Sequence, residues 1–274
     1  MKLIFFDIDG TLIDEHRHMP ESTVKAIRLA QQNGHLCLVN TGRTASIVLD
    51  WLPQLAPFDG YLCGCGTQIF FQGKELMHHV FTKEETINII EGLEKHKIDA
   101  ILEGEENDYH NHLEKMHTKT MRDYVVKHYS NRHWGHYEDA IGRFDKFYCY
   151  ADDRKAVPNF MAERADFLDA IDREDGFYEI VPKGYSKATC MDYLVEHLNL
   201  SGKYTKIINI GDTVAIGDSN NDLPMLEHAG TAIAMGVSSK QVLAMADYVT
   251  TPVLEDGVWN ALKWLGILEG EDRR

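Results

Sequence analysis

Hydrophobic and polar positions along this chain follow two different rhythms. At both ends of the chain, short apolar runs alternate with segments of helical spacing. The predicted strands are 3–6, 35–41, 60–66, 213–219, 231–235 and 247–250. The predicted helices are 19–34, 45–52, 186–200, 221–229 and 239–246. Short apolar runs bounded by turn residues are typical of strands covered on both faces. Their alternation with helices predicts an α/β fold with a doubly wound, Rossmann-like parallel sheet.

The rhythm changes in the middle of the chain. Two strand-like runs flank Gln72-Gly73 and predict a hairpin. A helix should follow over 82–96, where Thr82 and Glu85 have capping-box spacing. We expect Pro53 to close the helix before this region. The apolar stripe of the helix at 82–96 is predicted to be Ile87, Ile90 and Leu93.

Beyond that helix, strands and helices mix without the earlier order, and 144–150 and 177–184 look like antiparallel strands. We therefore predict two domains. A core would be formed by 1–81 and 185–274, and 82–184 would be an inserted α/β domain.

The composition narrows the range of partners and compartments. A net charge of −15 argues against nonspecific binding to nucleic acid or to an acidic membrane. Five scattered cysteines in mostly apolar runs suggest buried free thiols in a reducing cytoplasm. Four apolar residues before Asp7 are too few for a signal peptide, and no apolar run approaches the length of a membrane span. We expect a cytoplasmic protein.

Polar side chains gather where predicted parallel strands give way to loops. Ligands of open parallel sheets bind beyond the carboxyl ends of the strands, so these side chains should meet at one edge. They are Asp7 and Asp9, then Thr41, Gly42 and Arg43, then Asp218, Asn221 and Asp222, with Lys187 at the start of a helix.

Asp7 and Asp9 pose a physical question. Two positions apart on a strand, they would share a face about 6–7 Å apart. Two carboxylates at that distance repel by roughly 2–3 kcal/mol at an effective dielectric constant of about 20, so a cation or a shared proton is expected. Such a set could do phosphoryl chemistry: one carboxylate attacks phosphorus, a second protonates a leaving oxygen, and a third helps to hold Mg²⁺.

Four sequence motifs carry a family resemblance. "DIDGT", "NTGR", Lys187 and "GDSNNDLPML" resemble, in this order, the four motifs of the haloacid dehalogenase superfamily. The large insertion after the second motif is similar to that of the Cof-type phosphatases, and the resemblance covers nearly the whole chain. It implies a Mg²⁺-dependent phosphomonoesterase that acts on a small phosphorylated metabolite, such as a sugar phosphate or a phosphorylated cofactor. The insertion would be a mobile cap that selects the substrate, and the protein a monomer or small homo-oligomer.

The resemblance also implies roles for the residues at the sheet edge. Asp7 would attack phosphorus to form an aspartyl-phosphate, and Asp9 would protonate the leaving group and later activate water. The implied Mg²⁺ ligands are Asp7, the backbone carbonyl of Asp9 and Asp218, with Asp222 in support. Thr41, Gly42 and Lys187 would bind the phosphoryl group, with Asn221 and Arg43 nearby.

Two features depart from the family pattern. Cys65 stands before Gly66 where such phosphatases usually carry Asn, so an amide that could contact phosphate is missing. The tripeptide Ile-Gly-Asp occurs twice, ending at Asp212 and at Asp218. We expect Asp218 to join the site, because Asn221 and Asp222 follow it. Asp212 should lie in an exposed turn before a strand that leads away from it.

Plainer explanations exist for single residues. Asp7 and Asp9 could form a strand-end turn, Lys187 alone could be a solvated helix residue, and Asp222 could favour a helix dipole. Arg43 could equally form a structural ion pair or contact substrate. The histidines His110, His112 and His117 fit no standard zinc-ligand spacing, so a solvated surface or a substrate-facing loop is favoured.

Three other functional classes share part of the pattern. A sugar-phosphate mutase or phosphotransferase would share the first step but return the phosphoryl group to a substrate. A phospho-receiver domain combines similar acids but lacks "DxDGT" and needs no large insertion. A binding protein that has lost catalysis is disfavoured, because no acid of the set is missing. Release of free phosphate would separate hydrolysis from all three.

Overall fold

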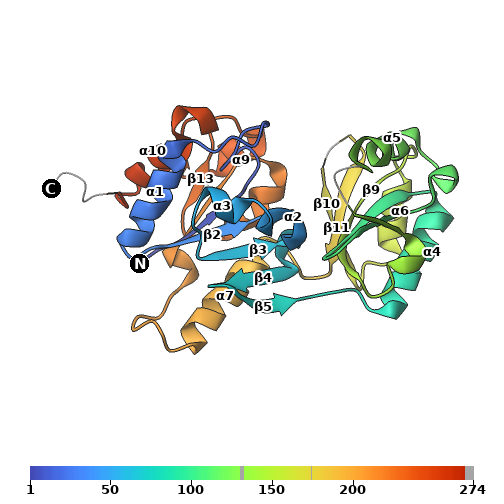
Figure 1. The fold of residues 1–274 in the computed structure, drawn as a ribbon, viewed down its shortest axis with the longest axis horizontal. Helices are drawn as coiled ribbons and strands as arrows, with labels where there is room; N and C mark the ends of the chain where they lie inside the picture. Colours follow the sequence, from blue (N-terminus) through green and yellow to red (C-terminus); the bar gives the residue numbers. More distant parts are fainter. Residues whose placement is uncertain (130–132, 174, 269–274) are drawn as a thin grey trace. The chain divides into compact units, whose positions relative to one another are not determined.

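The computed structural model describes residues 1–129, 133–173 and 175–268, and the chain divides into two compact units (Figure 1). The first unit consists of Met1–Arg43, Ile47–Leu76 and the chain from Ser186 onward. The second unit consists of Thr44–Ser46 and Met77–Tyr185, whereas the sequence placed the insertion at 82–184.

The first unit is built on an eight-stranded sheet in the order β14-β13-β12-β1-β2-β3-β4-β5. The strands are β1 (Leu3–Phe6), β2 (Leu36–Asn40), β3 (Gly60–Cys63), β4 (Gln68–Phe71), β5 (Lys74–His78), β12 (Thr213–Gly217), β13 (Ala232–Ala234) and β14 (Tyr248–Val249). From β14 to β3 all neighbours pair in parallel, and β4 turns back antiparallel to β3. The predicted α/β class with a parallel sheet core is confirmed.

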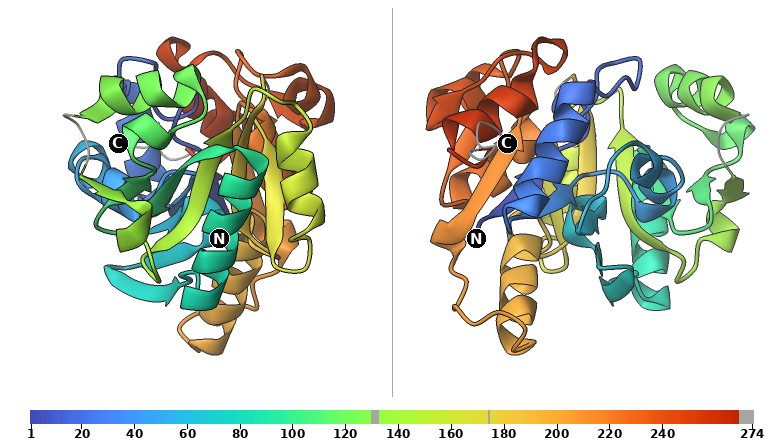
Figure 2. Two further views of the ribbon diagram at one scale, coloured as in Figure 1. Left: turned by 90° about the vertical axis from the view of Figure 1, so that its right-hand side faces the viewer. Right: turned by 60° about the vertical axis from the view of Figure 1, so that its left-hand side comes forward.

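Burial explains why the central strands lack an alternating pattern. All four residues of β1 and all five of β2 are buried, as expected for strands covered on both faces. The helices of this unit are α1 (Glu21–Gln32), α2 (Ala45–Leu49), α3 (Leu52–Leu55), α7 (Thr189–Leu200), α8 (Leu223–His228), α9 (Lys240–Met245) and α10 (Gly257–Trp264). Helices α1 and α10 lie side by side, as Figures 1 and 2 show.

The segment around Pro53 differs from its prediction. Instead of one helix closed by this proline, α2 ends at Leu49 and a second short helix, α3, begins at Leu52. Pro53 lies in the first turn of α3, where its missing N–H group has no helical partner to lose. Proline therefore starts a helix here, and the prediction that it ends one was wrong.

The second unit contains a six-stranded sheet in the order β10-β11-β9-β6-β7-β8. Its strands are β6 (Asp99–Gly104), β7 (Asp108–His110), β8 (Trp134–His136), β9 (Phe144–Tyr150), β10 (Leu168–Asp172) and β11 (Phe177–Pro182), and its helices are α4 (Lys83–His96), α5 (Lys119–His128) and α6 (Ala156–Ala162). Strands β9 and β11 pair antiparallel, as predicted. Side chains of α4 and α6 form one hydrophobic cluster with the sheet, and α5 contributes to a second.

Helix α4 confirms one detail of the sequence analysis and corrects another. Thr82 and Glu85 form the predicted capping box. The predicted stripe was wrong at Ile87, which is 39% exposed, and it missed the fully buried Ile89, whereas Leu93 is buried as predicted and Ile90 packs against the same hydrophobic cluster. A strict three-residue spacing drifts around a helix of 3.6 residues per turn. The buried face here includes Thr86, Ile89 and Leu93.

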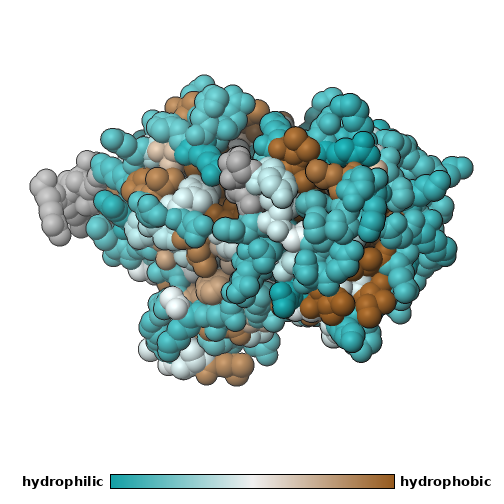
Figure 3. Space-filling model, turned by 45° about the vertical axis from the view of Figure 1, so that its right-hand side comes forward, coloured by the Kyte–Doolittle hydropathy of each residue, from teal (hydrophilic) through white to brown (hydrophobic). Residues whose placement is uncertain are grey.

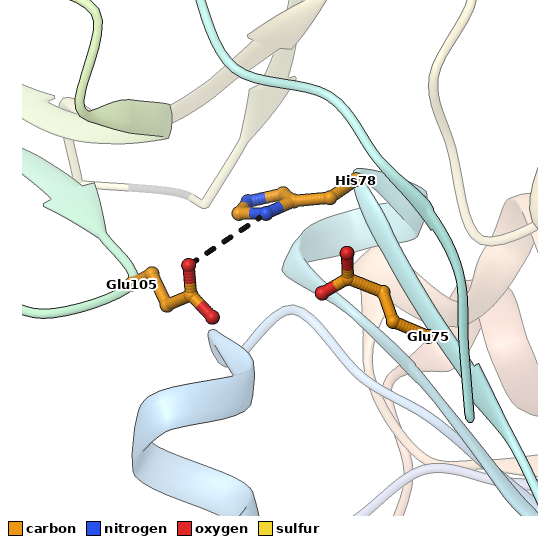
Figure 4. A group of neighbouring side chains, drawn as sticks. All are labelled: Glu75, His78 and Glu105. Atoms are coloured by element: carbon orange, nitrogen blue, oxygen red, sulfur yellow. Dashed lines mark ion pairs between the residues drawn. The ribbon is translucent and has the colours of Figure 1, made fainter. Parts of the chain in front are cut away.

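Within the second unit, His78 lies between two acids, Glu105 and Asp145. Its Nδ1 atom is 3.9 Å from a carboxylate oxygen of Glu105 (Figure 4), and its Nε2 atom is 3.8 Å from one of Asp145. The His78 side chain is 15% exposed and that of Glu105 is 59% exposed. Because Glu105 is solvated, this pair contributes little to stability.

The surface is mostly hydrophilic and the cysteine thiols are buried, as the composition indicated. Hydrophilic residues cover most of the face in Figure 3, and hydrophobic patches on it are separate from one another. All five cysteines are free and buried, as predicted. Among the helices of the described residues, none is both long and apolar enough to cross a membrane.

Candidate active site

Three adjacent strands bring the sequence motifs together. The central strands follow the order β12-β1-β2, and all three pair in parallel. Asp7 follows β1, Thr41 follows β2 and Asp218 follows β12. The backbone N–H of Asp7 donates to the carbonyl of Ile216 at 3.0 Å, which fixes Asp7 at the carboxyl end of the sheet. The motifs therefore share the edge where such sheets bind ligands.

A trio of acids lies at this edge. Asp7, Asp218 and Asp222 each offer a carboxylate oxygen, and these three oxygens lie within 4.8 Å of one another. Asp7 and Asp222 are almost completely buried, and Asp218 is half-buried. Carboxylates this close repel strongly in a poorly hydrated site, so the trio requires a cation or bound protons.

Lys187 supplies one cation. Its Nζ atom donates to Oδ1 of Asp7 and to Oδ1 of Asp222, both at 2.6 Å, and the side chain is 1% exposed. The turn that carries it is held by Ser186, whose hydroxyl accepts the backbone N–H of Thr189 at the start of α7. The alternative of a solvated lysine is therefore wrong. Lys187 is a buried cation bridging two acids of the trio.

The pKa values of these groups report the excess of negative charge. Burial, followed by Asp222, raises the pKa of Asp7 to about 7, although Lys187 acts in the opposite direction. Burial, followed by Asp7 and Asp222, raises the pKa of Asp218 to about 8. Burial disfavours the charged form of Lys187, but its two carboxylate partners raise its pKa above the usual range. One lysine does not balance three acids, so Asp218 favours a proton or a further cation.

Asp222 organises the loop after β12. Its Oδ2 atom accepts the backbone N–H groups of Asp218 and Ser219, both at 3.0 Å, while Oδ1 contacts Lys187. A Cβ atom at Gly217 would lie 2.7 Å from Cγ of Asp222. Glycine is required there because the carboxylate folds back onto the strand end. Asp222 thus holds both the Asp218 backbone and the lysine.

Gly10 has a similar role on the neighbouring loop. Its φ angle is +75°, in the region that favours glycine, and a Cβ atom would lie 2.5 Å from Oδ2 of Asp218. The glycine of "DIDGT" therefore permits the turn and leaves space for an acid from a distant motif.

Asp9 does not join the trio. The Nε and Nη2 atoms of Arg43 donate to its two carboxylate oxygens, both at 2.7 Å. The Asp9 side chain is 56% exposed. Of the two possibilities for Arg43, the structure contains the ion pair. This pair is solvated, so it contributes modestly to stability and can open at low cost.

The remaining predicted residues line the same loops. Thr41 is buried, its hydroxyl accepts the backbone N–H of Arg43 at 3.2 Å, and Gly42 lies between them. Asn221 is 7% exposed, and its side-chain oxygen accepts the hydroxyl of Ser219.

Sequence reasoning missed Asn40. This residue ends β2, is fully buried, and donates from Nδ2 to the backbone carbonyl of Lys187 at 2.7 Å. Its Oδ1 atom lies 3.5 Å from the thiol of Cys190. The amide ties the end of β2 to the turn that presents the lysine. The available signal was a polar side chain at the end of an otherwise apolar strand.

The turn after β3 carries the Cys65 departure. Cys65 has a φ angle of 55°, a left-handed conformation in which asparagine is enriched and cysteine is not. Its backbone N–H donates to the carbonyl of Thr41 at 3.0 Å. At Gly66, a Cβ atom would lie 2.6 Å from the carbonyl oxygen of Ser186. The backbone turn thus packs against the start of the lysine-bearing segment, with a buried thiol in place of the expected amide.

Asp212 and Asp218 lie at opposite ends of β12. Asp212 ends a short 3₁₀ turn directly before the strand, and its side chain is 23% exposed and 3.7 Å from Lys206. Asp218 follows the strand and belongs to the acid trio. The two copies of Ile-Gly-Asp are therefore not equivalent in position.

Comparison with known proteins gives relatives along nearly the whole chain. A family model described as haloacid dehalogenase-like hydrolase matches residues 4–262. The putative phosphatase YkrA of Bacillus subtilis is 28% identical over 287 residues, covering 98% of this chain and 99% of that protein. The 5-amino-6-(5-phospho-D-ribitylamino)uracil phosphatase YcsE of Bacillus subtilis is 24% identical, covering 96% of this chain and 95% of its own.

Solved structures give the same picture. The haloacid dehalogenase subclass IIB sugar phosphatase BT4131 is 26% identical, with a TM-score of 0.79, and the match covers 97% of this chain and all of that chain.

Asp218 should reduce the stability of the metal-free protein. Its folded pKa of about 8 exceeds the usual 3.8, so the folded state retains a proton that the unfolded chain loses. This contribution to stability therefore falls as the pH rises from about 4 to 8. In excess chelator at pH 8, Asp218→Asn should melt higher than wild type by about 2–4 °C, with a smaller gain at pH 5.

The matched control is Asp212→Asn. A backbone hydrogen bond from Asn209 lowers the pKa of Asp212, so this variant should melt no higher than wild type. Thermal melts of the three proteins at both pH values provide the measurement. A lower melting temperature for Asp218→Asn at pH 8 would show that the carboxylate is stabilised by its surroundings, contrary to this account.

Proposed function

We propose that this chain, which belongs to the haloacid dehalogenase-like hydrolase family, is a Mg²⁺-dependent phosphomonoesterase of small phosphorylated metabolites that uses an aspartyl-phosphate intermediate. One observation carries the proposal. Lys187 is buried between Asp7 and Asp222, beside Asp218, at the carboxyl edge of the parallel sheet. A buried ammonium among clustered acids suits a site that takes up a dianionic phosphoryl group together with a cation.

The acid trio fits Mg²⁺. Its donors are carboxylate oxygens, which hard cations prefer, and the raised pKa values of Asp7 and Asp218 mark groups that lack a sufficient positive partner. Asp7, Asp218 and Asp222 would hold the ion with the backbone carbonyl of Asp9. When bound, Mg²⁺ would neutralise charge on the acids and on the phosphoryl oxygens.

Asp7 is the proposed nucleophile. Its backbone is anchored to β12 and its Oδ1 atom is paired with Lys187, so we assign attack on phosphorus to Oδ2. The new Oδ2–P bond forms as the bond from phosphorus to the leaving oxygen breaks. Asp9 gives that oxygen a proton and then accepts one from the water that hydrolyses the acyl phosphate, which regenerates Asp7.

Asp9 must leave Arg43 to perform this role. In the bidentate pair both carboxylate oxygens of Asp9 accept N–H groups of Arg43, so neither oxygen is free to pass a proton to a leaving group. A phosphoryl group bound near Thr41 and Gly42 offers Arg43 another anion, which would release Asp9. The two uses of Arg43 weighed from the sequence are thus successive states in this proposal.

The second unit is the proposed substrate-selecting cap, and the proposed acceptor is water. Relatives named as phosphatases support water over a sugar hydroxyl. The runner-up remains a sugar-phosphate mutase or phosphotransferase, which would form the same phosphoenzyme and release no free phosphate.

Replacing the nucleophile tests the mechanism. Asp7→Asn should lower turnover by about 10³-fold or more while retaining the fold, because a carboxamide cannot form the acyl phosphate. A screen of phosphorylated metabolites with Mg²⁺, read as free phosphate, identifies the substrate first. Asp9→Asn should accumulate phosphoenzyme, detectable by intact mass. Near-normal turnover by Asp7→Asn would exclude this nucleophile.

The two copies of Ile-Gly-Asp provide a test of the cation site. Asp218→Asn should lower kcat/KM by about 10–100-fold and raise the Mg²⁺ concentration needed for half-maximal activity. Asp212→Asn, at the other end of β12, should leave both unchanged. Mg²⁺ titrations of the two variants after chelation decide the question, and full wild-type activity in excess chelator would rule out the metal.

Asn40 should act on catalysis through Lys187. Asn40→Ala removes a buried hydrogen bond and frees the turn that carries the lysine, so kcat should fall by about 10²-fold. Asn33→Ala is the matched control, because Asn33 donates to the carbonyl of Ile267 at the same 2.7 Å, away from the site. Both should lose stability, and a similar kcat for the two variants would reduce Asn40 to a structural role.

A further inference from the structure

Three histidines of the second unit gather at one edge of its sheet. Strands β7 and β8 pair in parallel with His110 opposite His136, so both imidazoles project from the same face of adjacent strands. Their ring centroids are 5.1 Å apart with planes at 85°. The His112 ring stacks on His136 at a centroid distance of 4.0 Å.

The separation of His110 and His136 matches that of two ligands of one metal ion. Imidazole nitrogens lie about 2.0–2.1 Å from Zn²⁺, and a ring centroid lies about 1 Å farther out. Two rings at a tetrahedral angle would then have centroids about 5 Å apart. The stacked His112 ring is too close to His136 to fit this arrangement. The His112 side chain would have to rotate away from the stack to become a ligand.

The hydrogen bonds of His110 leave one nitrogen with a lone pair and no donor. Nδ1 contacts the backbone carbonyl of Asn111, so Nδ1 carries the proton and Nε2 carries the lone pair. His110 is 2% exposed, and Nε2 finds no hydrogen-bond partner in the described part of the chain. Histidines that bind metals commonly donate their other N–H to a backbone carbonyl in this way. A buried unsatisfied acceptor is costly without a ligand.

Further donors lie next to this pair, but in the described part of the chain no third His, Cys, Asp or Glu has a ligand atom within 4.8 Å of both rings' ligand atoms, so a neighbouring side chain must turn to complete the site. Nδ1 of His136 is also buried and makes no hydrogen bond of normal geometry, although this side chain caps the turn that follows. On the open side, Nε2 of His112 lies 3.3 Å from Oε1 of Glu138, which is 63% exposed. Lys115, at 4.0 Å from the same oxygen, is solvated and free to move away.

We propose that His110 and His136, completed by Glu138 or His112, form a binding site for a borderline transition-metal cation of the Zn²⁺, Co²⁺ or Ni²⁺ class. Imidazole nitrogens select such ions over Mg²⁺, which prefers oxygen donors. This site is separate from the acid trio in composition and in the chain segments that form it. The spacing of histidines along the sequence does not reveal this site, because His136 comes from another strand. His117, which is nearer in sequence to His110, pairs with Glu94 and not with the other histidines.

Burial lowers the pKa of His110 below its ordinary value, and the His136 and His112 rings act in the same direction, although the hydrogen bond to the Asn111 carbonyl opposes them. This direction favours the neutral imidazole, which is the form that binds metals.

The test uses the untagged full chain with saturating Mg²⁺, which occupies the acid trio. Co²⁺ is titrated calorimetrically and by its visible absorption, whose intensity and position report nitrogen ligands in a tetrahedral site. Wild type should bind one Co²⁺ under these conditions. His110→Gln and His136→Gln should each weaken binding by about 10–100-fold.

His117→Gln is the matched control. His117 is close to His110 and His112 in sequence, but it is not one of the three histidines that gather at the sheet edge. Its Co²⁺ affinity should equal that of wild type. Melting curves in metal-free buffer check that each variant folds. If His110→Gln does not fold, the result for His136→Gln decides the test, because His136 is only half-buried. Unchanged binding in His136→Gln, equal loss in His117→Gln, or no Co²⁺ binding by wild type would each overturn the proposal and leave a packed histidine cluster.

Discussion

The first unit depends on one buried ion bridge. Lys187 joins Asp7, directly after β1, to Asp222, after β12, with both contacts at 2.6 Å and almost no exposure to solvent. Charges removed from water are tolerated when each is paired and hydrogen-bonded, and removing one partner leaves another charge buried and uncompensated. The surrounding structure meets this requirement: Asn40 holds the lysine backbone, and two backbone N–H groups hold Asp222.

The bridge leaves the site short of positive charge. Two acids are paired with one lysine, and the third, Asp218, has a raised pKa because burial and its neighbours disfavour its charge. In the proposed function, a bound cation would balance the charge of this site, and the same lysine would then be available to a phosphoryl group. Stability and the proposed function would thus compete at Asp218, as is common where binding groups are clustered. The glycines at 10 and 217 allow the carboxylates to approach this closely.

The two units also differ in the kind of donor they concentrate. Oxygen donors lie at the carboxyl edge of the parallel sheet, and imidazole nitrogens lie on neighbouring strands of the mixed sheet. In the two proposals, a hard cation such as Mg²⁺ would bind the oxygen donors and a borderline cation such as Zn²⁺ would bind the imidazoles. The type of ligand would therefore direct each cation to its own site.

The sequence by itself determined the fold class, the strands of the core and the motif residues at its edge. These follow from local rules, because apolar runs of strand length and acids at strand ends have the same meaning wherever the chain is placed. It also identified Thr82 and Glu85 as a capping box, which needs only neighbours in sequence. It failed at Pro53 and at Ile87 of α4, because several local arrangements are compatible with the same residues and tertiary packing selects one of them.

Tertiary structure alone decided the long-range contacts. Asn40 reaches Lys187 across 147 positions, and Arg43 reaches Asp9 across 34. Which of two carboxylates meets a lysine, and whether a histidine faces another strand, depends on the order and register of strands in a sheet. Those are set by the burial of the whole core and cannot be read from spacing along the chain. The chain thus specifies the chemical groups, and the sheet determines which of them meet.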